Sequence, residues 1–76
     1  MDEVKCRKIE HFNELFESCI NENGEVLPCG RQMCIRLIHF AKRNFPDGEV
    51  VYGDESTGYM NVEKLISLHS KLNPTN

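Results

Sequence analysis

Four cysteines carry most of the chemistry that this 76-residue chain could perform. They are Cys6, Cys19, Cys29 and Cys34, and no two of them form a Cys-x2-Cys pair. Because thiolates are ligands for zinc, one interpretation is a single irregular zinc site built from all four. The other is four reduced thiols that pack as small hydrophobic side chains. The sequence favours the second, since no histidine stands at zinc-finger spacing from the cysteines.

Histidines do not complete a catalytic couple with these thiols. Nothing in the sequence places His11 or His39 beside a cysteine, and a chain this short offers little room for a cleft. We therefore expect no catalytic residues.

Composition excludes several classes of partner. Nine basic and twelve acidic side chains give a net charge of −3, whereas nucleic-acid-binding domains usually carry a basic face. No apolar stretch approaches the roughly 20 residues that span a bilayer. The first residues lack the apolar segment of a signal peptide. We expect no nucleic-acid or membrane partner, and an intracellular location, cytoplasmic or nuclear, where thiols stay reduced.

Apolar spacing predicts the elements that position these residues. Residues 34–43 and 61–72 each carry one helical apolar stripe, and 10–20 fits a short helix or an ordered loop. Short strands are expected at 25–27 and 50–52, next to turn signals. These elements predict a small α+β domain with a central helix and a C-terminal helix.

The segment 26–38, Val-Leu-Pro-Cys-Gly-Arg-Gln-Met-Cys-Ile-Arg-Leu-Ile, resembles the middle of a RING finger. In that family a Pro-Cys-Gly-His turn precedes Cys-x2-Cys and a short helix. Residues 45–50 resemble the lead-in to the last ligand pair, and 60–66 resemble the Asn-capped helix that often follows. The resemblance covers nearly the whole chain. It implies a RING-like or U-box-like fold with a short β-hairpin over 1–58, and a C-terminal helix packed on it over 59–76.

A RING cross-brace uses eight zinc ligands in four pairs: the first and third pairs hold one ion, the second and fourth the other. The corresponding positions in this chain are Cys6, Ile9, Cys29, Arg31, Cys34, Leu37, Val51 and Asp54. Neither site keeps enough thiolate or imidazole to close a tetrahedron. The resemblance therefore implies a degenerate zinc finger that lacks the usual two ions. We expect no cofactor, with one zinc ion as the alternative.

Side chains would have to replace the two metals. At the first site Ile9 and Leu37 would fill the vacated space by apolar packing. At the second site Arg31 and Asp54 would face each other as an ion pair, as in the zinc-free U-box relatives of RING domains.

The departures from the family pattern argue against ligase activity. RING ligases are similar in using an apolar residue inside the first pair to dock a ubiquitin-conjugating enzyme, where this chain has Lys8. We expect a non-catalytic protein–protein interaction or dimerisation module, a pseudo-RING scaffold that binds a protein partner or forms a homodimer. Its candidate interaction surface is the stripe of Leu65, Leu68 and Leu72. The alternative is a ubiquitin ligase domain that binds a ubiquitin-conjugating enzyme directly or through a partner RING.

Overall fold

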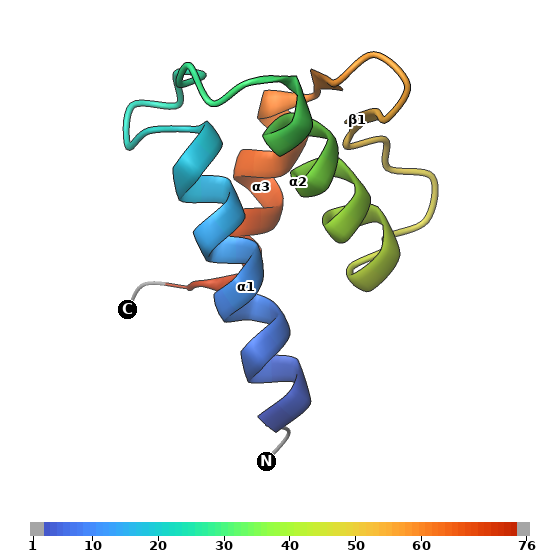
Figure 1. Cartoon of the computed structure of the whole chain (residues 1–76). Helices are drawn as coiled ribbons and strands as arrows, with labels where there is room; N and C mark the ends of the chain where they lie inside the picture. Colours follow the sequence, from blue (N-terminus) through green and yellow to red (C-terminus); the bar gives the residue numbers. More distant parts are fainter. Residues whose placement is uncertain (1–2, 75–76) are drawn as a thin grey trace.

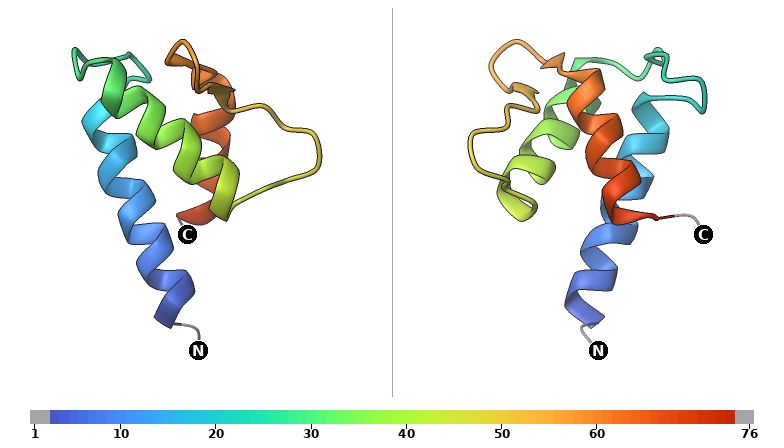
Figure 2. Two further views of the ribbon diagram at one scale, coloured as in Figure 1. Left: turned by 45° about the vertical axis from the view of Figure 1, so that its right-hand side comes forward. Right: turned by 180° about the vertical axis from the view of Figure 1, so that it is seen from behind.

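The computed structural model describes residues 3–74, which fold into three helices and one short hairpin (Figure 1). In chain order the elements are α1 (Glu3–Cys19), α2 (Arg31–Asn44), β1 (Gly53–Asp54), β2 (Tyr59–Met60) and α3 (Val62–Leu72). The α+β class, the short hairpin, the central helix and the C-terminal helix are confirmed. In the rear view of Figure 2, α3 lies in front of α1 and α2 and runs across the space between them.

Helix α1 starts earlier than the sequence pattern indicates. Its buried face begins at Phe12 and continues through Leu15, Phe16 and Cys19, which is the helical spacing predicted for 10–20. The preceding two turns are mostly charged and largely exposed, and they project away from the other helices (Figure 1). Glu, Lys and Arg favour helix, so these turns form without an apolar face to bury.

Helix α2 begins at Arg31, before the expected start at residue 34. Gly30 precedes it with φ 85°, a backbone conformation that glycine adopts at little cost. Leu37, Ile38 and Ala41 are its buried residues. The helix ends at Asn44, and the following Pro46 cannot continue it.

The turn between α1 and α2 is where the sequence predicts it, but the strand after it is not. The Asn21 side-chain oxygen accepts hydrogen bonds from the backbone N–H groups of Asn23 and Glu25, both at 2.9 Å. In place of a strand over 25–27, a single antiparallel bridge joins Ile20 to Val26.

The expected strand over 50–52 is also wrong. The hairpin pairs Gly53 with Met60 and Asp54 with Tyr59. Tyr52 instead turns into the core, and its hydroxyl donates to the Phe45 carbonyl at 2.9 Å. A tertiary hydrogen bond therefore fixes this residue, and no neighbouring strand is needed.

Helix α3 follows the prediction, and the Asn61 side chain accepts a hydrogen bond from the Lys64 N–H at 3.4 Å as its N-cap. Its apolar stripe is already used, because Leu65 and Leu68 are 0% and 7% exposed within the core. Leu72 is half-buried against the same core. This corrects the candidate interaction surface: Leu65 and Leu68 hold the chain together and do not face outward.

Candidate metal centre

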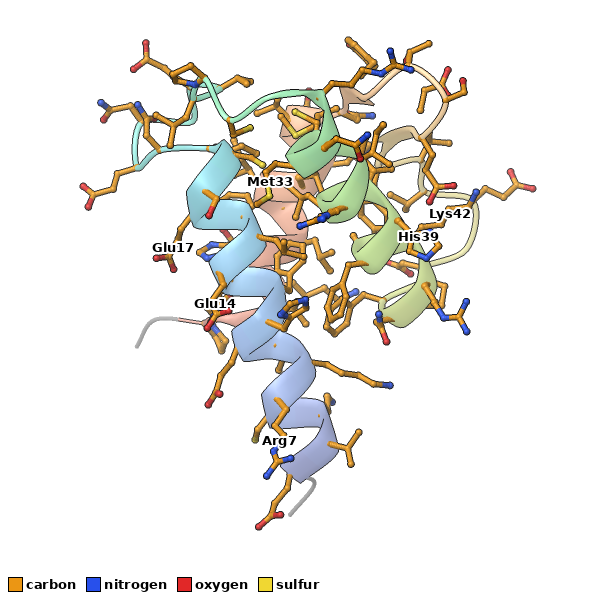
Figure 3. All side chains as sticks on the ribbon, in the orientation of Figure 1. Arg7, Glu14, Glu17, Met33, His39 and Lys42 are labelled. Atoms are coloured by element: carbon orange, nitrogen blue, oxygen red, sulfur yellow. The ribbon has the colours of Figure 1, made fainter. Side chains whose placement is uncertain are left out.

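Three cysteines meet where α1, the connection after it and α2 come together. Cys19 ends α1, Cys29 lies in the connection, and Cys34 lies in the first turn of α2. Their sulfur atoms all lie within 4.8 Å of one another. The sulfurs of Cys29 and Cys34 are 3.7 Å apart. In Figure 3 sulfur atoms gather between the end of α1 and the start of α2, close to Met33.

Backbone hydrogen bonds hold the three segments in register. The Leu27 N–H donates to the Cys19 carbonyl at 2.8 Å, which ties the connection to the end of α1. The Cys29 N–H donates in turn to the Leu27 carbonyl at 2.7 Å. The Cys34 N–H donates to the Gly30 carbonyl at 3.3 Å and opens α2. These backbone hydrogen bonds therefore hold the segments that carry the three cysteines close together.

Burial is graded across the cluster. Cys19 is fully buried, whereas Cys29 and Cys34 are half-buried and pack against the core from outside. An ion would therefore reach the sulfurs from the side of Cys29 and Cys34, and Cys19 would supply the ligand from beneath.

The same surroundings keep the thiols of Cys19 and Cys34 protonated when no cation is bound. Burial, together with the neighbouring Cys29 and Cys34 thiols, raises the pKa of Cys19 to about 12. Burial also raises the pKa of Cys34, with Cys29 adding to the effect. Near neutral pH the Cys19 and Cys34 thiols are thus uncharged and can pack as small apolar side chains. Binding of a metal ion must displace their protons.

The donor set suits a thiophilic metal ion. Zinc–thiolate bonds are about 2.3 Å long, so two sulfurs on a tetrahedral zinc ion lie about 3.8 Å apart. The separation of Cys29 and Cys34 already matches that distance. Cys19, Cys29 and Cys34 would hold the ion, and one coordination position would remain for water or another donor.

Cys6 does not belong to this group. It lies more than three turns before Cys19 on the same helix, about 20 Å away, and its side chain is exposed. The sequence interpretation of one site built from all four cysteines is therefore wrong in its ligand set, because a straight helix keeps these two thiols apart.

Arg31 and Asp54, which the resemblance assigns to the second and fourth ligand pairs, lie near each other but do not form an ion pair. The Arg31 guanidinium donates to the Ser56 carbonyl at 2.9 Å. The Asp54 carboxylate accepts from the Ser56 N–H at 2.9 Å and from its hydroxyl at 2.6 Å, and these bonds lower the pKa of Asp54. Among the ion pairs of residues 3–74 there is none between Arg31 and Asp54. Instead of pairing with each other, both side chains form hydrogen bonds with Ser56. Val51, the other fourth-pair position, is exposed.

The residues that the resemblance assigns to the first and third ligand pairs do not lie in one place: some pack in the core and others lie outside it. Leu37 is fully buried in the core, whereas Ile9 is half-buried on α1 and lies outside the core cluster. Cys34 is beside Cys29 and Cys19, and Cys6 is exposed. The structure thus groups the thiols differently from the pairing that the resemblance implies.

Comparisons with known proteins identify no relative: no family model, no curated protein and no solved structure matches the chain. Within residues 3–74, no helix is both long enough and apolar enough to cross a membrane. The site is therefore interpreted from its own geometry.

Proposed function

We propose that this chain is a small, non-enzymatic zinc-binding domain in which Cys19, Cys29 and Cys34 hold one Zn²⁺ ion. The observation that carries this proposal is the convergence of three sulfur atoms, from three separate segments, within 4.8 Å. A group of thiolate donors at short range suits tetrahedral zinc.

A bound zinc ion would stabilise the fold. One ion bound to these cysteines links the end of α1, the connection and the start of α2. A domain of this size has a marginal hydrophobic core and often needs a metal or disulfide to hold it. Zinc binding then adds directly to folding stability, because the unfolded chain does not hold the three thiolates together.

A structural role fits better than a catalytic one. Catalytic zinc sites keep an open position, as this site would, but they also have a general base beside it. In the part of the chain that the structure describes, the only group of three or more potential ligands is made of cysteines alone. No carboxylate or imidazole joins it to act as a base.

Titration of the reduced protein with Co²⁺, a spectroscopic substitute for Zn²⁺, tests the proposal. We expect one equivalent to give thiolate-to-metal charge-transfer absorption that Zn²⁺ then abolishes. Cys29→Ser and Cys34→Ser should each lose this signal, and Cys6→Ser, the matched control, should keep it. Circular dichroism without metal checks that each variant is folded. Absence of the signal in the parent chain, or its loss in Cys6→Ser, would refute the site.

A second candidate is the pseudo-RING interaction or dimerisation module that the sequence resemblance implies. It is supported by the common contact of Arg31 and Asp54 with Ser56, which brings the second and fourth pair positions together. Sedimentation would reveal a homodimer, and discharge of ubiquitin from conjugating enzymes would reveal ligase activity. We expect no stimulated discharge, and a clear stimulation would favour the ligase alternative.

A further inference from the structure

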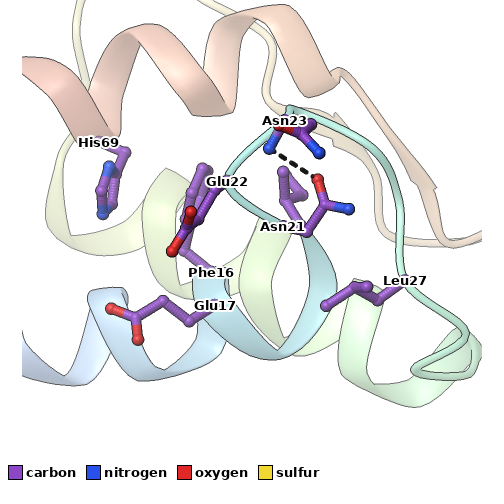
Figure 4. Close-up of a pocket in the computed structure, with 8 residues that line it drawn as sticks. Phe16, Glu17, Asn21, Glu22, Asn23, Leu27 and His69 are labelled. Carbon is purple, nitrogen blue, oxygen red and sulfur yellow. Dashed lines mark hydrogen bonds between the residues drawn. The ribbon is translucent and has the colours of Figure 1, made fainter.

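A groove of about 700 Å³ lies between the last turn of α1, the connection that follows it and α3 (Figure 4). Its apolar surface comes from Phe16, Ile20 and Leu27, and its far wall is His69 of α3. The His69 ring stacks on Phe16 with a centroid separation of 4.2 Å and an interplanar angle of 10°. The groove therefore combines aromatic and aliphatic surface at one opening.

Its charge is negative from two independent sources. Glu17 and Glu22 line the groove, and no lysine or arginine does so. The last turn of α1 also carries no basic residue, so the negative end of its helix dipole is not compensated there. The groove thus has apolar surface below and negative potential around its opening, within a chain of net charge −3.

Long basic side chains have the complementary chemistry. Their methylene stems cover apolar surface while the charged head stays at the polar margin. A guanidinium also makes paired hydrogen bonds with carboxylates and stacks on aromatic rings, which an ammonium does less well. Nucleic acids and anionic lipids would be repelled by Glu17 and Glu22.

We propose that this groove binds an arginine side chain in an extended basic segment of a partner protein. The volume lies within the range of pockets that enclose most of a drug-sized ligand, which is large enough for one arginine side chain. Asn23, also in the lining, offers its side-chain amide to the ligand backbone. The inference is independent of the proposed zinc site, because none of the three cysteines lines the groove.

The test uses a capped Leu-Arg-Leu peptide and its citrulline counterpart, which keeps the shape and removes the charge. Backbone amide shifts in the NMR spectrum should follow binding at residues 21–27 and at His69. We expect the citrulline peptide, and separately a Glu17→Gln/Glu22→Gln variant, to weaken binding by about fivefold or more. The matched control is Glu14→Gln, which removes an exposed carboxylate one turn earlier on α1 and outside the groove (Figure 3).

Several results would overturn the inference. These are equal binding of the two peptides, shifts confined to another surface, or an equal loss in Glu14→Gln. Binding of free arginine as tight as that of the peptide would identify a small-molecule site instead. Repeating the titration with and without Zn²⁺ keeps the two proposals separate, because a failure of metal binding leaves the groove measurement unchanged.

Discussion

The two halves of α1 have opposite surroundings although they belong to one continuous helix. The half from Phe12 to Cys19 is packed by α2 and α3, and its thiol joins two others. The half from Glu3 to Lys8 projects from the domain, and its thiol, Cys6, is exposed. The same residue type on the same helix is thus a candidate metal ligand at one end and a solvent-facing group at the other. The two cysteines differ because two other segments of the chain bring their thiols to the Cys19 end of the helix.

The largest effect that separates the two halves is on folding stability. Phe12 is fully buried and meets the rings of Phe16 and Phe45, each at a centroid distance of 5.8 Å. Phe12→Ala should lower the free energy of unfolding by about 3–5 kcal/mol, measured by urea denaturation of the metal-free protein. Val4→Ala, in the exposed half, is the control and should change it by less than about 0.5 kcal/mol. Similar losses in both variants would mean that the projecting half is also packed.

A second difference concerns pH. Because the pKa of Cys19 rises to about 12 in the folded chain from an ordinary value of 9.0, the folded state holds this proton where the unfolded state has lost it. Stability of the metal-free protein should therefore be unaffected by Cys19 below pH 9. Above it, stability should fall by up to about 1.4 kcal/mol per pH unit.

Denaturation at several pH values between 8 and 11 measures this slope. Cys19→Ala removes the thiol, so its slope should be shallower than that of the parent chain, which also corrects for other groups that ionise there. A parent slope equal to that of Cys19→Ala would show that the buried thiol does not titrate as described.

A smaller effect on folding stability is expected at Asn13, where the buried half of α1 begins. Asn13 and Asn73 exchange two side-chain hydrogen bonds, at 2.8 and 2.9 Å, which tie α1 to the end of α3. Asn13→Ala should cost about 1 kcal/mol of stability in thermal or urea unfolding, since both bonds are lost and Asn73 is left part-buried. Asn73→Ala should cost a similar amount, and the double variant should cost less than the two singles added. Full additivity would contradict a direct pair.

The sequence predicts the elements whose signals are local. Asn61 and the apolar stripe after it define α3, and the stripe of α2 is equally clear. The first turns of α1 lack such a stripe, so the pattern misses them. The strand expected at 50–52 fails because Tyr52 is fixed by a contact with Phe45 that no local pattern reveals.

The candidate site depends still more on distant contacts. Cys29 and Cys34 are close in sequence, and their pairing could be suspected from spacing. Cys19 joins them only because the turn at Asn21 and the Leu27–Cys19 hydrogen bond fold the connection back onto α1. Sequence reasoning treats Cys19 as a packed thiol, since it stands on the apolar stripe with Phe12. The expected pair of Arg31 with Asp54 fails for a similar reason, because the backbone and hydroxyl of Ser56 take both partners.

Alkylation of each cysteine, followed by mass spectrometry with and without Zn²⁺, tests the central claim most directly. Without the ion, exposed Cys6 should react fastest and buried Cys19 slowest. With one equivalent of Zn²⁺, the half-buried Cys29 and Cys34 should become strongly protected together, while the rate at Cys6 stays the same. Protection that extends equally to Cys6, or no protection at Cys29 and Cys34, would contradict a metal centre at the junction of α1 and α2.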